Sequence, residues 1–503
     1  MMRIIDGAAL AEHQELSAEV VIVGSGAGGA VVAKILAEAG VDVVVLEEGP
    51  YVPDHVYERY RPTETLRKIG REAGTTAVLG LGDTPIITVM AGRAVGGSSL
   101  MTGGVCFRVP ELIHDRWVKD RGLHELDERS MEAAFESAEH ESSVAEVPVA
   151  MRSQSTHRFV DGATKLGIPV KPMRRNMDGC VGHARCNFGC PVGAKKSVDK
   201  TYLPKAIAAG AQVYSSVRVD RILESHGRAI GVEGVLLGPS KHRIRVRAAR
   251  VVVAAGSIHS PLLLKKSGFR GRAVGRHLTL HPGFRVVARF KDEVLGWKGA
   301  LQSAYVDAFE QQGITLTSLF LPPSVFAAGL PGVGRAYADR VGELGHLGLF
   351  GGLVHDDDGG QVHPFVGREP LITYRLSPKN KQSMIRGIQI LAETYLAAGA
   401  IEVYAPFFGM APLRHASEVP RVIHDGLSAK KMECVTFHPL GTCRIGRSMD
   451  EGVVDAWGRA FELPGVVVVD GSVFPTSIGV NSQLPIMAMA TRLGWRLRDE
   501  LRS

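Results

Sequence analysis

The segment from residue 19 to residue 47 limits the possible folds of this chain more strongly than any other part of the sequence. Val20–Val23 is a short apolar run, as expected for a parallel strand buried on both faces. It leads into a glycine-rich turn, Gly24-Ser25-Gly26-Ala27-Gly28-Gly29. A helix is predicted over Ala30–Ala39 and a second buried strand over Val43–Leu46. This order of elements predicts a nucleotide-binding α/β unit.

Three glycines of this turn have a predicted task. Gly24 permits the tight turn, Gly26 lets the backbone approach a pyrophosphate, and Gly29 allows the helix to pack closely on the strand. Glu47 ends the second strand, where an acid accepts hydrogen bonds from an adenosine ribose. The unit therefore predicts a bound dinucleotide, without choosing between NAD and FAD.

Further pieces of the same domain are spread along the chain. Residues 91–99 form a second glycine-rich loop, and strands are predicted over Val217–Leu223 and Val251–Ala255. Another buried strand, Val466–Val469, leads into a final amphipathic helix. Because these pieces lie in the first and last hundred residues as well as between them, the predicted nucleotide-binding domain is discontinuous.

The intervening segments follow a different pattern. Val286–Phe290, Leu301–Val306, Ile314–Leu321 and Leu371–Leu376 show partial alternation, which predicts an antiparallel sheet with one covered face. The predicted fold is α/β, with a discontinuous Rossmann-like domain and a second domain built on an antiparallel sheet. The first domain is expected to comprise residues 1–110, 200–285 and 435–503, and the second residues 111–199 and 286–434.

Composition and charge exclude several classes of protein. The formal net charge is +7 at pH 7, but Lys and Arg are scattered, whereas nucleic-acid binding needs them in a stripe or tail. The first twenty residues carry acids and no apolar core, so no signal peptide is expected. The longest uncharged run, Gln311 to Gly334, contains prolines that forbid a straight spanning helix. Six cysteines are too few for a disulfide scaffold, and a cytoplasmic location is expected.

Five motifs in order make the chain resemble the glucose–methanol–choline (GMC) flavoprotein oxidoreductases. They are Val23–Gly29, Gly92–Ser99, Gly256–Leu264, Phe437–Gly446 (FHPLGTCRIG) and Val469–Met489. The resemblance implies FAD as cofactor, a flavin-binding domain and a sheet-based substrate domain. It also implies oxidation of a small-molecule alcohol, by hydride transfer to flavin N5, with oxygen or another electron acceptor completing the cycle.

Within the family, the chain is most similar to bacterial members related to long-chain-alcohol and cholesterol oxidases. The stretch that carries this similarity is Cys186–Ser197 (CNFGCPVGAKKS), followed by Thr201-Tyr202-Leu203. An apolar alcohol is therefore the expected substrate. The apolar segment Leu316–Leu330 is either part of the internal packing or an apolar mouth of the active site that touches lipid or sterol-like alcohols. The second alternative would bring the protein into peripheral contact with membranes.

The resemblance also implies the catalytic residues. His438 matches the family's catalytic histidine, and its ordinary pKa of about 6.5 leaves the imidazole neutral and proton-accepting near physiological pH. Asn481 matches the second position, from which an amide donates to the substrate oxygen. Pro485 places the start of the last helix close to Asn481, and the positive end of that helix would stabilise an anionic reduced flavin.

The residues expected to bind FAD come from all of these motifs. The chain departs from many relatives at position 102, where it has Thr in place of Asn in a loop near the flavin ring. The expected set is Gly24, Gly26, Ala27, Gly28, Gly29, Glu47, Glu48, Arg93, Gly96, Gly97, Ser98, Thr102, Gly103, Gly104, Val219, Ala255, Gly256, Asp470, Gly471, Asn481, Ser482 and Gln483.

Three cysteines leave an alternative open. Cys180, Cys186 and Cys190 have the spacing C-x5-C-x3-C, which is similar to the segment that holds an iron–sulfur cluster in bacterial sugar dehydrogenases of the same family. We expect these cysteines to be packed thiols that bind no metal. This expectation also excludes a zinc site in which His183 would be the fourth ligand. The alternative functions are a dehydrogenase of sugars or polyols with a quinone or protein acceptor, and a lyase that keeps a non-redox FAD.

Overall fold

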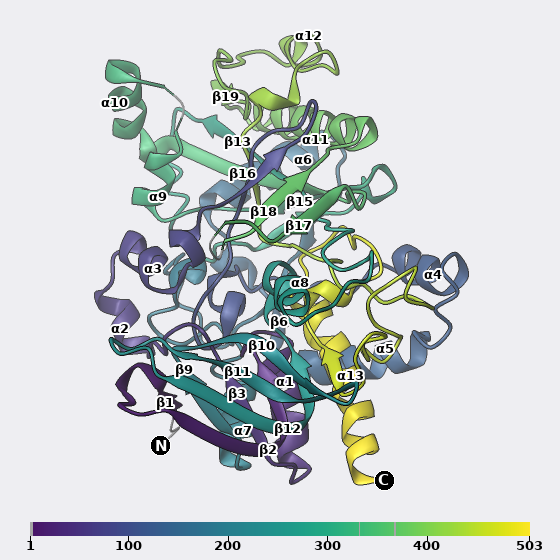
Figure 1. Ribbon diagram of the computed structural model, residues 1–503. Coiled ribbons are helices and arrows are strands. Elements are labelled where there is room, and N and C mark those ends of the chain that lie inside the picture. Colours follow the sequence, from purple (N-terminus) through teal and green to yellow (C-terminus); the bar gives the residue numbers. More distant parts are fainter. Residues whose placement is uncertain (1–3, 331, 367–368) are drawn as a thin grey trace.

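The computed structural model describes residues 4–330, 332–366 and 369–503, and it contains two large sheets (Figure 1). The first sheet has the strand order β1-β9-β3-β2-β12-β11-β10, with β21 paired to β12. Its strands are β1 (Ile4–Asp6), β2 (Gln14–Val23), β3 (Val43–Leu46), β9 (Gln212–Ser215), β10 (Val217–Ser225), β11 (Arg228–Leu236), β12 (Arg243–Val253) and β21 (Val466–Val468).

The centre of this sheet is parallel and buried on both faces. β2 pairs in parallel with β3 and with β12, and β12 pairs in parallel with β21. All four residues of Val20–Val23 and of β3 are buried, as the apolar runs predicted. Helix α1 (Gly29–Glu38) returns the chain between β2 and β3 and is followed by Gly40, which adopts the left-handed conformation with φ +75°.

The second sheet is largely antiparallel and lies above the first in Figure 1. Its strand order is β17-β18-β4-β5-β20-β13-β16-β15-β14-β7, with β19 paired to β13. The strands are β4 (Thr76–Gly80), β5 (Ile87–Val89), β7 (Lys171–Pro172), β13 (Gly283–Arg289), β14 (Ala304–Val306), β15 (Ile314–Ser318), β16 (Leu347–Val354), β17 (Gly360–His363), β18 (Leu371–Tyr374), β19 (Glu402–Tyr404) and β20 (Cys434–Thr436). A separate short pair joins β6 (Val144–Glu146) to β8 (Arg174–Asn176).

Helices cover both sheets. α13 (Gln483–Arg502), the predicted final helix, packs against α1 and α5 (Glu128–Glu141). α11 (Pro378–Ala397) covers the second sheet together with α6 (Gln154–Lys165). The others are α2 (Asp54–Arg59), α3 (Pro62–Ile69), α4 (Glu111–Lys119), α7 (Tyr202–Ala208), α8 (Gly256–Lys266), α9 (Pro323–Ala328), α10 (Gly334–Gly342) and α12 (Val419–Val422).

Two segments pack elsewhere than their expected domains. β4 and β5, from residues 1–110, join the second sheet, because β4 pairs with β18 and β5 with β20. Conversely, α4 and α5, from residues 111–199, belong to the core of the first sheet, where Trp117 and Phe135 are buried. Both corrections arise from long-range pairing and burial, which the amphipathic pattern of a segment does not specify.

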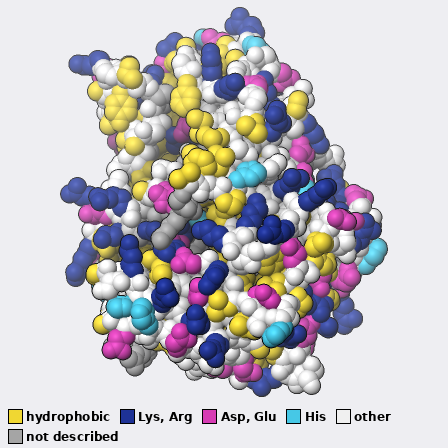
Figure 2. Space-filling view, in the orientation of Figure 1, with side chains coloured by type: hydrophobic (Ala, Val, Ile, Leu, Met, Phe, Trp, Pro, Cys, Tyr) yellow, Lys and Arg dark blue, Asp and Glu magenta, His cyan; other side chains and the backbone are white. Residues whose placement is uncertain are grey.

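The surface agrees with the charge pattern of the sequence. Figure 2 shows Lys and Arg side chains dispersed among Asp and Glu over this face. Among the described residues, no helix has the length and apolar character that a membrane crossing requires. The apolar segment near residue 320 is mainly internal packing, because Phe320 and Phe326 are fully buried with neighbouring apolar side chains.

Candidate active site

A cavity of about 380 Å³ lies where the two domains meet. The first domain contributes the glycine-rich turn after β2, the ends of β3 and β12, and the starts of β10, α8 and α13. The second contributes Gln302 and Leu319, next to strands β14 and β15. The carboxyl ends of the parallel strands β2, β3 and β12 thus face the cavity, which is where α/β sheets bind nucleotides.

The two glycine-rich loops touch each other beneath the cavity. A Cβ atom on Gly97 would lie 2.8 Å from the Cα of Gly26, so the two backbones are in contact. Ser25 ties them together, because its hydroxyl accepts from the Gly96 N–H at 3.0 Å and donates to Glu47 Oε2 at 2.7 Å. This role of Ser25 was not predicted, although the residue stands inside the motif.

Glu47 lies at the end of β3, as the motif requires. Its carboxylate also accepts from the backbone N–H groups of Ser25 at 3.0 Å and Gly49 at 2.8 Å. Burial raises the pKa of Glu47, and these hydrogen bonds act in the opposite direction. The acid therefore braces the glycine-rich turn in addition to facing the cavity.

Most of the predicted cofactor residues line this cavity, and three do not. Gly29, Gly96 and Gly104 lie outside the lining and act on the backbone instead. A Cβ on Gly29 would lie 2.0 Å from the Gly24 oxygen, as expected for close helix–strand packing, and Gly96 and Gly104 have φ values of +99° and +78°. Those that line it are Gly24, Gly26, Ala27, Gly28, Glu47, Glu48, Arg93, Gly97, Ser98, Thr102, Gly103, Val219, Ala255, Gly256, Asp470, Gly471, Asn481, Ser482 and Gln483.

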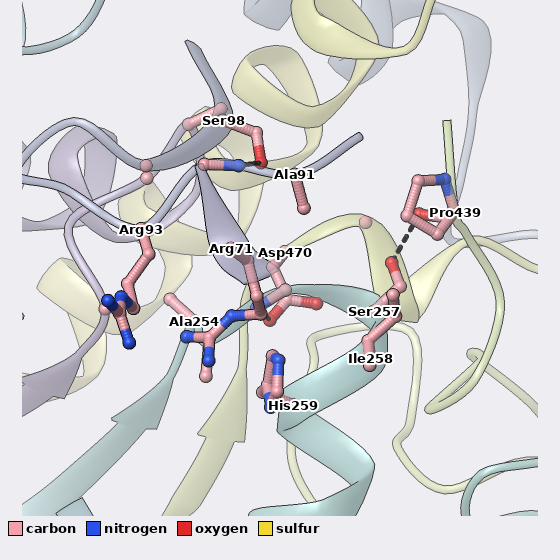
Figure 3. A pocket seen from close by; sticks show the side chains of 18 of the residues that line it. Arg71, Ala91, Arg93, Ser98, Ala254, Ser257, Ile258, His259, Pro439 and Asp470 are labelled. Carbon is pink, nitrogen blue, oxygen red and sulfur yellow. Dashed lines mark hydrogen bonds between the residues drawn. The ribbon is translucent and has the colours of Figure 1, made fainter. Parts of the chain in front are cut away.

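One end of the cavity is lined by Arg and Lys side chains and by a histidine. Figure 3 shows Arg71, Arg93 and His259 grouped near the glycine-rich loops, and Lys266 also lines this space. Arg71 is paired with Glu48. Burial first, and then the neighbouring cations, lower the pKa of His259 well below its ordinary value. Only Arg93 and Glu48 were predicted here. Arg71 and Lys266 lie outside the recognisable motifs, and His259 lies inside the Gly256–Leu264 motif but was given no role.

His438 and Asn481 meet at the opposite end. Asn481 Nδ2 lies 3.1 Å from His438 Nε2, and an amide N–H can only donate, so Nε2 is the acceptor. The imidazole proton is therefore on Nδ1, which is buried without a partner among the described residues. Burial lowers the pKa of His438 to about 4, which corrects the ordinary value assumed from the sequence.

Two buried cations hold the loop that passes between these ends. Lys195 Nζ donates to the carbonyl oxygens of Ser99, Leu100, Thr102 and Cys186 at 2.6–3.0 Å, and burial lowers its pKa to about 8. The Arg175 guanidinium donates to the Gly103 oxygen. The cofactor loop is thus anchored from behind by residues that the sequence did not single out.

The cysteine segment is part of this anchor. Cys186 is buried, and its Sγ accepts a hydrogen bond from Arg175 Nη2 at 3.0 Å. Cys180 and Cys190 are half-buried, and all three thiols are free. Within the described ranges, no group of three or more His, Cys, Asp or Glu side chains is arranged to hold a metal ion.

Comparison with known proteins identifies the family. Residues 18–283 match the N-terminal family model of GMC oxidoreductases, and residues 362–490 match the C-terminal one. The chain belongs to the GMC oxidoreductase family. Its cofactor is therefore FAD, as the resemblance of the motifs implied.

Relatives and solved structures agree with this assignment. An uncharacterized GMC-type oxidoreductase of Mycobacterium tuberculosis is 36% identical over 94% of this chain and 74% of its own. A long-chain-alcohol oxidase of Arabidopsis thaliana is 27% identical over 96% of this chain and 68% of its own. The crystal structure of pyridoxine 4-oxidase from Mesorbium loti has the same fold, with a TM-score of 0.74, 19% identity, and coverage of 95% of this chain and 99% of that one.

The cavity of this GMC protein fits FAD. A Cβ on Gly26 would meet only Gly97, at 3.9 Å, so the open space above it admits a pyrophosphate against the backbone. Gln483 begins α13 and presents a buried Nε2 without a partner in the described structure, while its Oε1 accepts from the Thr102 hydroxyl. This unpaired donor and the positive end of α13 suit an electron-rich ring system.

Proposed function

We propose that this protein oxidises an alcohol CH–OH to an aldehyde or ketone, with His438 as the base. The observation that carries the proposal is the contact of 3.1 Å between His438 Nε2 and Asn481 Nδ2 in the wall of the FAD cavity. A bound flavin supplies the hydride acceptor, at N5. The side chains of this protein supply the proton acceptor and orient the substrate.

The two side chains divide the task. A substrate hydroxyl that enters between them donates its proton to His438 Nε2. This nitrogen carries the lone pair, because it accepts from Asn481 Nδ2 when no substrate is present. The same hydroxyl oxygen accepts from Asn481 Nδ2, which fixes the carbon that bears the hydride. Because burial lowers the pKa of His438 to about 4, the imidazole is neutral throughout the neutral range, with one ring nitrogen free to accept.

An apolar alcohol is the first candidate substrate. Leu319, Phe437 and Val105 line the cavity, and relatives include long-chain-alcohol oxidases. Asn187 and Gln302 favour a second candidate, an alcohol with further polar groups such as a polyol, because both amides line the cavity and Asn187 Oδ1 is buried without a partner in the described structure. Oxygen is the proposed electron acceptor, with a quinone or protein acceptor as the alternative.

Anaerobic flavin reduction tests the proposal. The FAD-loaded protein is mixed with 1-dodecanol in detergent, benzyl alcohol, pyridoxine or glucose, and the bleaching of the flavin is followed by stopped flow. His438→Ala is expected to retain FAD and to reduce it roughly 10²–10⁴-fold more slowly with the best alcohol, the usual worth of a positioned base. Asn481→Ala is expected to lose less, because it donates without accepting the proton.

Two outcomes would contradict the proposal. An unchanged reduction rate in His438→Ala, at equal flavin content, would remove the base from the mechanism. A wild-type flavin that stays oxidised with every alcohol, while a hydroxynitrile such as mandelonitrile is cleaved, would assign the protein to the lyase alternative instead.

A further inference from the structure

One buried carboxylate outside the cavity lining connects the segments that carry His438 and Asn481. Asp356 follows β16, its side chain is 3% exposed, and among the described residues no Lys or Arg pairs with it. Instead it accepts four hydrogen bonds. Its Oδ2 accepts from Leu280 N at 2.8 Å and from the Tyr374 hydroxyl at 2.7 Å. Its Oδ1 accepts from His281 N at 3.1 Å and from the Ser477 hydroxyl at 2.9 Å.

The first branch from Asp356 leads to His438. The backbone N–H of Leu280 donates to Asp356. The carbonyl oxygen of Leu280 accepts a hydrogen bond from the Thr436 hydroxyl. The same hydroxyl of Thr436 accepts from the backbone N–H of His438 at 3.2 Å. Asp356 is thus three hydrogen bonds away from the backbone that carries the base.

The second branch leads to Asn481. Ser477 donates to Asp356, and the next two N–H groups, of Ile478 and Gly479, both donate to His281 Nε2 at 3.1 Å. His281 is itself held by Asp356 through its backbone N–H. The turn that presents Asn481 is therefore fastened at three successive residues to the same buried centre.

We propose that Asp356, acting through Ser477 and His281, is the positioning residue that keeps Asn481 in register with His438. The inference rests on the proposed function, since it concerns the pair that function uses. Asp356 touches neither the cavity nor the contact of 3.1 Å between the two side chains. Its contribution is the relative placement of two segments that lie more than forty residues apart in the chain, which no local backbone preference can set.

The first experiment compares substitutions at neighbouring residues in the FAD-loaded protein. In Asp356→Asn one carboxylate oxygen becomes an N–H2 group that faces two donors, so the flavin-reduction rate at saturating alcohol should fall about 10²-fold, the scale of a misplacement near 1 Å. Asp357→Asn is the matched control. Asp357 is exposed, accepts from Ser377 and Asn380 at the start of α11, and should leave the rate unchanged.

The second experiment separates positioning from stability, and it does not depend on Asp356→Asn folding. Ser477→Ala removes only the branch to Asn481, and we expect the reduction rate constant to fall about tenfold, with little change in the alcohol concentration for half-saturation. In the Asn481→Ala background the same substitution should have no further effect, because its target is gone. Ser477→Thr, which keeps the hydroxyl, should restore the rate.

The outcomes distinguish the inference from the function it rests on. Equal fold losses for Ser477→Ala with and without Asn481, or no loss at all, would overturn the positioning role while His438→Ala still reported the base. The positioning role would also be overturned if Asp357→Asn lowered the flavin-reduction rate as much as Asp356→Asn does. All of these rates are measured with the best of the four alcohols named above. If His438→Ala reduced flavin at the wild-type rate, the proposed function itself would be wrong.

Discussion

The two ends of the cavity are built from different parts of the polypeptide. The glycine-rich end is made of backbone, where Gly26 and Gly97 touch and Ser25 bridges the loops. The catalytic end is made of side chains, His438 and Asn481, which belong to separate segments and meet through one contact of 3.1 Å. The first depends on two glycine-rich loops whose backbones approach closely, and the second on a network of side-chain hydrogen bonds between distant segments.

This difference has a consequence for substitution. At the glycine-rich end Gly26 and Gly97 have no side chain to remove, so a substitution there can harm binding only by adding atoms that fill the space. At the catalytic end a side chain can be removed with the fold intact, and the cost appears in the rate. Substitutions at the two ends should therefore separate loss of cofactor from loss of chemistry.

The largest effect is expected at Gly26. Its added Cβ would meet no atom closer than 3.9 Å, so Gly26→Val should fold, yet the side chain would stand in the cavity and exclude FAD. The variant should purify without flavin absorbance and without activity. Gly342→Val adds the same atoms in open space on α10 and should keep full flavin content. Stoichiometric FAD in folded Gly26→Val would place the cofactor elsewhere.

Protonation of the catalytic end should give the next largest effect. His438 accepts a proton only when neutral, so the flavin-reduction rate should stay level between about pH 6 and 9 and decline below the pKa of about 4, roughly tenfold per pH unit. Rapid pH jumps with stopped-flow detection avoid acid unfolding. A half-maximal rate near pH 6.5 that disappears in His438→Ala would show that burial does not lower this pKa.

The smallest effect on chemistry is expected behind the cofactor loop. Replacing Cys180, Cys186 and Cys190 together by Ser removes packing and a sulfur acceptor, and should lower the free energy of unfolding by about 1–2 kcal/mol. Flavin reduction by alcohol should be retained. Denaturant titration and stopped flow measure these quantities, and about three irons per wild-type chain, lost in the variant, would instead support an iron–sulfur centre.

The fold was largely predictable because its decisive signals are local. An apolar run followed by Gly24, Gly26 and Gly29 constrains dihedral angles and packing within a few residues, and the structure has the strand, turn and helix where they were expected. The assignment of β4 and β5 was wrong because their alternating pattern shows that one face is buried, without showing against which sheet.

The candidate site divides in the same way. His438 and Asn481 were found from short motifs, but Lys195, Arg175 and Asp356 were not, because a buried charge is recognised only by the partners that surround it. The lowered pKa of His438 likewise follows from desolvation, which cannot be predicted from the neighbouring residues in the sequence.

The sequence by itself therefore determined the nucleotide-binding unit, the family and the identity of the two candidate catalytic side chains. The tertiary structure alone decided which nitrogen of His438 accepts, how acidic that ring is, and how its segment is held against that of Asn481. The physical reason is range. Backbone conformation is set by adjacent residues, whereas burial and hydrogen-bond partners are set by segments that folding brings together from distant parts of the chain.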